Sequence, residues 1–151
     1  MFEIEIFTKK GFKDSRGEHV LSDICGIGIK DVTKVEYTSL YIIDGDINKN
    51  EAMAIASELL TDKITEKFEI SSNFMPRKYK KSVIEVLYKK GITETVSESI
   101  VKAIKDLRIS KEVKVKTGHK YYMHGNISQG ILDKVAVKLL ANTLVQKYKI
   151  R

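Results

Sequence analysis

The chain has 151 residues and a formal net charge of +7, with 42% hydrophobic and 31% charged residues. This composition is typical of globular proteins and excludes disordered and fibrous classes, and apolar runs of four or five residues fall far short of the roughly 20 that a membrane helix needs. The only cysteine, Cys25, excludes an internal disulfide and a cysteine-based zinc site within one chain. The first residues also lack the basic and apolar segments of a secretory signal, so we expect a cytoplasmic protein.

The chain contains an internal repeat. Residues 2–70 align with residues 82–150 without a gap at a constant offset of 80, and 18 of the 69 aligned positions, or 26%, are identical. Between the copies, residues 71–81 contain the only proline, Pro76, and four Lys or Arg residues, which indicates a linker. The sequence therefore predicts a first repeat at 1–70, a linker at 71–81 and a second repeat at 82–151.

Each copy is expected to begin with a strand and a helix. Phe2, Ile4 and Ile6 alternate with glutamates, as in a half-buried strand, and the second copy has Ile84 and Val86 at the equivalent positions. Ser15-x-x-Glu18 and Thr95-x-x-Glu98 then match the capping box that starts a helix. Apolar residues at helical spacing follow both boxes: Val20, Ile24 and Ile27 in the first copy, and Val96, Ile100, Ala103, Ile104 and Leu107 in the second.

Two further strands are expected in each copy, at 32–38 and 40–44 in the first and at 113–117 and 120–124 in the second. Thr117-Gly118-His119 has the glycine of a hairpin turn between the latter two. The first copy has Tyr37-Thr38-Ser39 at this position, without a glycine.

The second helix of each copy has the clearest periodicity. Its apolar residues recur at i, i+3, i+4, i+7 and i+8: Ala52, Ile55, Ala56, Leu59 and Leu60, then Leu132, Val135, Ala136, Leu139 and Leu140. Asn48 and Ser128 are the expected N-caps. A last strand is expected to carry Ile64, Phe68 and Ile70 in the first copy and Leu144, Tyr148 and Ile150 in the second.

These elements predict an α+β fold of two tandem βαββαβ, ferredoxin-like repeats. In each repeat, two helices are expected to cover one face of a four-stranded, mostly antiparallel sheet. Because a repeat of about 70 residues buries relatively little surface alone, we expect the copies to pack as an intramolecular pseudo-dimer.

Charge is distributed unequally between the copies. Residues 1–70 have a net charge of −5, the linker +4 and residues 82–151 +8, so the copies can attract one another or face different partners. The tyrosines Tyr41, Tyr121 and Tyr122 beside basic segments resemble an RNA-binding sheet superficially, but the aromatic motif of an RNA-recognition module is absent. The sequence does not favour nucleic-acid binding.

Catalytic motifs are also missing. No phosphate-binding loop, nucleophile elbow or His-Glu-x-x-His motif occurs, and Gly26-Ile27-Gly28 lacks the third glycine of a dinucleotide fingerprint. His119 and His124 are five residues apart on an expected strand, which points their side chains to opposite faces and argues against a shared metal ion. We therefore expect no catalytic residue, no metal and no cofactor.

Several segments resemble the PurS subunit of phosphoribosylformylglycinamidine synthase. They are the stretch from Lys10 to Gly17, Val32-x-x-Val35, Val115 to Tyr121, and above all Leu139-Leu140-Ala141-Asn142-Thr143-Leu144-Val145-Gln146-Lys147-Tyr148. The resemblance implies a small non-catalytic subunit that associates with a large synthetase subunit and a glutaminase subunit. In that family PurS forms dimers, holds the complex together and helps ammonia to pass, so a tandem copy corresponds to a dimer in one chain.

The second copy keeps this pattern better than the first, since Thr61-Asp62-Lys63 replaces Ala141-Asn142-Thr143. Our hypothesis is that the expected hairpin docks on the synthetase through Thr117, Gly118, His119, Lys120, Tyr121 and Tyr122. The other interpretation is that this hairpin merely closes the sheet of the pseudo-dimer. For the whole protein, a ferredoxin-like ligand-binding or regulatory module remains the alternative function, and association of the chain with further copies of itself remains open.

Overall fold

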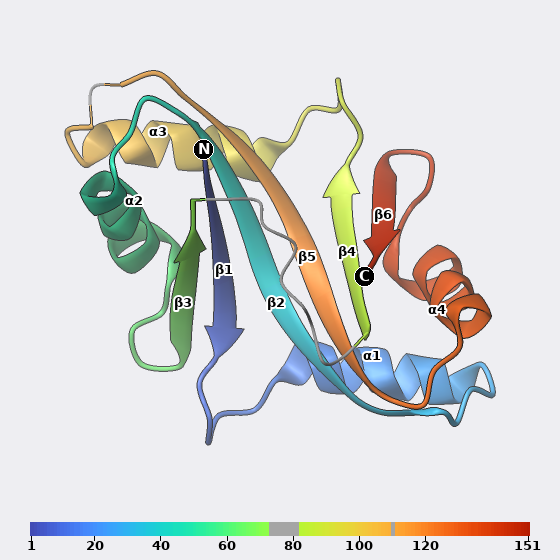
Figure 1. The fold of residues 1–151 in the computed structure, drawn as a ribbon. Coiled ribbons are helices and arrows are strands. Elements are labelled where there is room, and N and C mark those ends of the chain that lie inside the picture. Colours follow the sequence, from blue (N-terminus) through green and yellow to red (C-terminus); the bar gives the residue numbers. More distant parts are fainter. Residues whose placement is uncertain (73–81, 110) are drawn as a thin grey trace. The chain divides into compact units, whose positions relative to one another are not determined.

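The computed structural model describes residues 1–72, 82–109 and 111–151, so most of the expected linker lies outside the described residues. The first repeat contains β1 (Phe2–Thr8), α1 (Ser15–Gly26), β2 (Val32–Gly45), α2 (Lys49–Ile55), the π-helix η1 (Ala56–Leu60) and β3 (Glu66–Ser71). The second contains β4 (Ser82–Tyr88), α3 (Thr95–Asp106), β5 (Val113–Gly125), α4 (Gln129–Val135), the π-helix η2 (Ala136–Leu140) and β6 (Gln146–Ile150). The strand order in the sheet is β3-β1-β2-β5-β4-β6 (Figure 1), which confirms the α+β class.

One long strand in each repeat replaces the two strands that we expected. β2 has 14 residues and β5 has 13, and the proposed hairpin turn at 117–119 is wrong because these residues lie inside β5. Position 118 has no room for a side chain. An added Cβ atom would lie 2.5 Å from the carbonyl oxygen of Val86 and 2.5 Å from Cδ2 of Leu87. β4 therefore passes β5 more closely than a side chain would allow.

The chain forms two compact units, and each draws on both repeats. Unit 1 consists of Met1–Phe12, Ser39–Pro76 and Thr93–Thr117, and unit 2 of Lys13–Thr38, Arg77–Ile92 and Gly118–Arg151. Both long strands are divided between the units, while α3 belongs to unit 1 and α1 to unit 2. Each unit thus contains a complete βαββαβ set of elements, with one helix and half of a long strand supplied by the other repeat.

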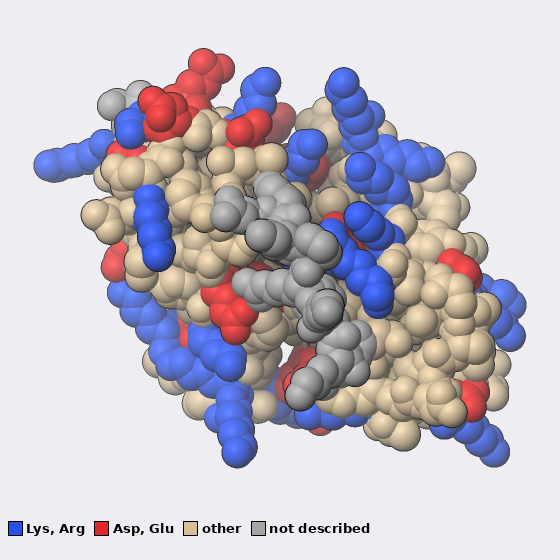
Figure 2. All heavy atoms as spheres, viewed as in Figure 1, with Lys and Arg blue, Asp and Glu red and all other residues tan. Residues whose placement is uncertain are grey.

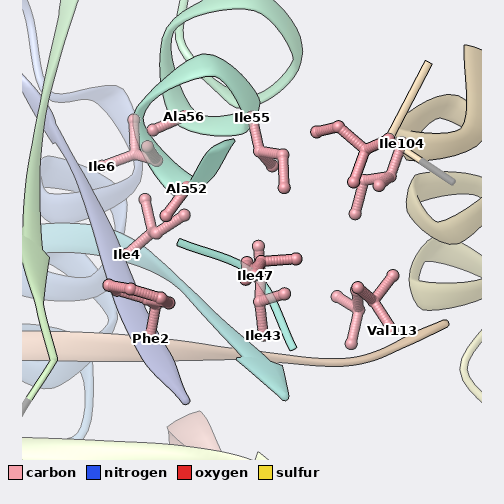
Figure 3. Packing of buried hydrophobic residues seen from close by; sticks show 12 residues of the cluster. Phe2, Ile4, Ile6, Ile43, Ile47, Ala52, Ile55, Ala56, Ile104 and Val113 are labelled. Atoms are coloured by element: carbon pink, nitrogen blue, oxygen red, sulfur yellow. The ribbon is translucent and has the colours of Figure 1, made fainter. Parts of the chain in front are cut away.

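The core of unit 1 is mainly aliphatic. β1 pairs antiparallel with β3, which sets Ile4 opposite Ile70. Ile4, Ile55 and Ile104 are fully buried and come from β1, α2 and α3, as the packing in Figure 3 shows. The helix of the second repeat therefore closes a core whose other members come mainly from the first.

Unit 2 is built in the same way. β4 pairs antiparallel with β6, with Ile84 opposite Ile150, and α1 contributes the fully buried Ile24. Val135 of α4 completes this core together with Met123 of β5. The periodic positions expected in the second helix of each repeat are confirmed as inward-facing, although the last turns wind as π-helices.

The first helix of each repeat begins one residue earlier than the predicted capping boxes. The N-cap of α1 is Asp14, which accepts a hydrogen bond from the amide of Gly17 at 2.9 Å, and the N-cap of α3 is Glu94. The boxes at Ser15 and Thr95 are therefore wrong. By contrast, Asn48 and Ser128 are confirmed as caps, and Asn48 forms a reciprocal capping box with Glu51.

The last strand of each repeat begins later than expected. Ile64 and Leu144 lie in turns before β3 and β6, and they are 75% and 84% exposed. Their assignment to half-buried strands is wrong, because an Asp or Asn side chain two residues earlier bonds the backbone and forms a turn. No helix among the described residues is long and apolar enough to cross a membrane.

Candidate functional site

The six residues predicted to contact a partner lie in the middle of β5. Tyr121 and Tyr122 are 8% and 9% exposed, Lys120 is 1% exposed, and Gly118 is buried. Only Thr117 and His119 of the six keep intermediate exposure. The side chains of this segment thus serve mainly the interior of the chain.

His119 belongs to an aromatic cluster with Tyr37 of β2. The Tyr37 hydroxyl lies 2.6 Å from Nδ1 of His119, and its ring centroid lies 5.5 Å from that of Tyr121. Arg16 of α1 donates a hydrogen bond to the same hydroxyl and places its guanidinium 4.8 Å from the centre of the Tyr37 ring. The arrangement joins a helix start to two strands of unit 2 through one tyrosine.

The surroundings of the cluster favour the neutral forms of the His119 and Tyr121 rings. Burial, and secondarily the positive charge of Arg16, lower the pKa of His119 below its usual value. Burial also raises the pKa of Tyr121 to about 12. Nδ1 of His119 is engaged by the Tyr37 hydroxyl, so this nitrogen is not free to act as a general base.

The side chains of the two acidic N-cap residues bond neighbouring strands, although only that of Asp14 also caps its helix. Asp14 accepts a hydrogen bond from the Tyr37 amide at 2.8 Å, and Glu94 accepts bonds from the Thr117 amide and hydroxyl at 2.9 and 2.7 Å. Asp14 and Glu94 are 80 residues apart, so each repeat has one such hydrogen-bonded contact between a helix start and a strand. Sequence reasoning missed them, although a carboxylate directly before each proposed box was a readable signal.

Lys120 enters a buried group of charges. It faces Glu85 across the β4–β5 pair with its ammonium 4.0 Å from the carboxylate, and Arg151 lies 3.7 Å from the same carboxylate. Removing one member of such a buried pair leaves an uncompensated charge and is strongly destabilising. Lys120 therefore contributes to the fold of unit 2.

The expected separation of the two histidines is confirmed. His119 contacts Tyr37, whereas His124 lies 2.8 Å from the carboxylate of Glu36, and consecutive residues of a strand face opposite sides. Across residues 1–72, 82–109 and 111–151, no group of three or more His, Cys, Asp or Glu side chains is arranged to hold a metal ion.

A shallow apolar groove of about 330 Å³ lies on unit 1 between α3 and η1. It is lined by Leu59, Thr95, Val96, Ser99, Ile100 and Ala103. At an offset of 80, unit 2 has Arg16 in place of Val96, and its His19 and Asp23 form an ion pair at 3.5 Å. The equivalent surface of unit 2 is thus polar, and the two units differ in the chemistry of this helix face.

The first repeat is similar to a known family. The family model PurS, described as phosphoribosylformylglycinamidine (FGAM) synthase, matches residues 1–73. Residues 1–73, just under half of the chain, are therefore similar to PurS. A search of curated proteins finds no match to the chain.

The PurS match lies on the repeat that we expected to be the more diverged, so it gives no support to the expected ranking of the two repeats. The second repeat carries the same order of strands and helices as the PurS repeat. The chain therefore presents a PurS-type repeat followed by a second copy of the same secondary structure.

Proposed function

We propose that this chain is a cytoplasmic, non-catalytic PurS-type subunit of an FGAM synthase complex. In this role it binds the large synthetase subunit and the glutaminase subunit, holds them together, and supports the transfer of ammonia between them. The observation that carries the proposal is the PurS family match over residues 1–73.

The character of the polar clusters agrees with a non-catalytic role. The Tyr37 hydroxyl engages Nδ1 of His119, and Glu85 and Lys120 are buried. Contacts of this kind stabilise a scaffold.

The test is reconstitution with the synthetase and glutaminase from the same source. Glutamine-dependent formation of FGAM is measured with and without this chain, and the three proteins are examined by size-exclusion chromatography. We expect a large gain in glutamine-dependent activity and co-elution of all three. Unchanged activity together with separate elution would refute the proposal.

Ammonium chloride provides the matched control. When it replaces glutamine, the synthetase no longer needs ammonia delivered by the glutaminase, so this chain should raise that activity much less. Equal stimulation with both nitrogen sources would contradict a role in ammonia transfer and leave only a role in activating the synthetase.

The mass of the complex offers an independent check of the tandem arrangement. One chain with two repeats should take the place of a PurS dimer, so the complex should contain one chain per synthetase. A requirement for two whole chains per synthetase would argue against the pseudo-dimer role.

The groove on unit 1 favours one alternative, a ligand-binding or regulatory module, because it is concave and mostly apolar. Binding of a small apolar ligand that alters activity would favour this alternative. Nucleic-acid binding has less support, because the buried rings of Tyr121 and Tyr122 cannot stack on bases.

A further inference from the structure

The turn before β3 is held in shape by its own polar side chains. Oδ1 of Asp62 accepts hydrogen bonds from the amides of Ile64 and Thr65 at 2.9 and 3.3 Å. Oε1 of Glu66 accepts a bond from the Asp62 amide at 2.9 Å. The side chain of Ile64 contributes none of these bonds, yet it is 75% exposed at the end of the turn.

The turn before β6 repeats this construction with different residues. Oδ1 of Asn142 accepts from the Leu144 amide at 3.2 Å, and Oε1 of Gln146 accepts from the Asn142 amide at 2.8 Å. Leu144 is 84% exposed. All five residues differ between the two turns, but both turns place a branched aliphatic side chain in solvent.

This exposure has no benefit for folding. Burial of a leucine or isoleucine side chain stabilises a fold, and these two exposed side chains make little of that contribution. A polar residue would serve a solvent-exposed turn equally well. The retained aliphatic character at equivalent positions of two otherwise diverged turns therefore points to a contact outside the chain.

A second loop lies beside each turn. In unit 1, Nζ of Lys9 donates to the carbonyl of Lys63 at 2.6 Å and its amide donates to the carbonyl of Thr65 at 2.8 Å. The loop continues to Phe12, whose side chain is 48% exposed. We call residues 9–12 and 62–65 the tip surface of unit 1.

Unit 2 has the equivalent tip surface, residues 89–92 and 142–145. Nζ of Lys89 donates to the carbonyl of Thr143 at 2.6 Å, and its amide donates to the carbonyl of Val145 at 2.8 Å. Ile92, the counterpart of Phe12, is 38% exposed. Each tip surface thus combines two exposed apolar side chains with a lysine fixed against the turn.

The charge of the tip surfaces indicates what would bind them. Lys9-Lys10 and Lys89-Lys90 precede the exposed apolar residues, and Figure 2 shows blue atoms gathered at the loop after β1 and at the loop after β4. Within the described ranges, neither Lys9 nor Lys89 has a carboxylate within 4 Å. A complementary surface would offer an apolar pocket with carboxylates on its rim.

We propose that the tip surfaces dock this chain on the large synthetase subunit, with Ile64 and Leu144 entering apolar pockets and Lys9 and Lys89 facing carboxylates at the pocket edges. The proposal rests on the proposed function for the identity of the partner. It replaces the docking hypothesis for residues 117–122, whose side chains are mostly buried.

The test measures the affinity of the full-length chain for the purified synthetase by calorimetry. The variants Ile64→Thr and Leu144→Thr are made singly and together, and Val137→Thr, which alters a 49% exposed residue of η2, is the matched control. Each single tip variant should weaken binding at least tenfold, the double variant more, and the control less than twofold. Circular dichroism and melting temperature should be unchanged, because the altered side chains lie in solvent.

A second pair of variants tests the charges. Lys9→Gln and Lys89→Gln should lower the affinity and also reduce its dependence on salt, because a charge pair at the rim of an interface is screened. Equal affinity of Ile64→Thr, Leu144→Thr and the control would overturn the tip proposal while leaving the proposed function intact. If the unaltered chain does not bind the synthetase, the proposed function fails first.

Discussion

Replacing Gly118 by alanine tests the close approach of β4 and β5. The new Cβ atom would lie 2.5 Å from a backbone oxygen, that of Val86, and 2.5 Å from the terminal carbon of Leu87. A leucine side chain can rotate away, but the backbone oxygen can move only if β4 shifts. Forcing extra atoms into a packed region costs typically about 1–3 kcal/mol.

For a chain of this length, that loss corresponds to a fall in melting temperature of roughly 2–12 °C, since each kcal/mol shifts it by about 2–4 °C. Urea unfolding followed by circular dichroism measures the loss directly. The double variant Gly118→Ala/Leu87→Ala should remove the side-chain clash and keep the backbone clash. We therefore expect the two substitutions to be non-additive, with only part of the Gly118→Ala loss recovered in the cycle.

Gly130 provides the matched control. It lies in α4, and a Cβ added there meets no atom within 4 Å, so Gly130→Ala should stabilise the chain by about 0.5–1 kcal/mol. If Gly118→Ala were as harmless as Gly130→Ala, the close approach of the strands would be refuted. That result would favour the predicted hairpin turn at this position.

Three further predictions concern the helix cap and the aromatic cluster. Asp14→Ala should lower the free energy of unfolding in urea by about 1–2 kcal/mol, because the carboxylate caps α1 and also binds the Tyr37 amide. Ser15→Ala should lower it little. Equal losses would indicate that Ser15 is the cap. Because the pKa of His119 is lowered on folding, the unfolded chain takes up a proton first as the pH falls through about 6.5, and stability should drop there. The variant His119→Asn should show a smaller fall in melting temperature between neutral and mildly acidic pH, and an identical fall would contradict the pKa argument. Tyr121 should form tyrosinate only near pH 12, so a spectroscopic titration of Tyr121→Phe should lack a late component that the unaltered chain shows.

The sequence was sufficient to predict what depends on periodicity. The buried residues of the second helices and the caps Asn48 and Ser128 follow from local patterns, and the structure contains them. These features depend on neighbours within a few residues, which a sequence displays directly.

The features that failed depend on residues far away in the chain. Gly118 looked like a turn residue, but the reason for a glycine there is the backbone of Val86, 32 positions earlier. Ser15 matched a capping box, yet Asp14 is the cap and is also fixed by the amide of a distant strand. Local pattern and tertiary contact compete at such positions, and here the tertiary contact decides.

Because α3 of the second repeat packs in unit 1 and α1 of the first repeat packs in unit 2, the chain cannot fold one repeat at a time during synthesis. When the first repeat leaves the ribosome, α1 has only part of its core to cover, because its packing partners in β4, α4 and η2 have not been synthesised. Unit 1 is equally incomplete at that stage, since α3 is still missing. Neither unit can therefore finish folding during synthesis of the first half, and a nascent or truncated chain would offer apolar helix surface to chaperones and proteases until the last strand arrives.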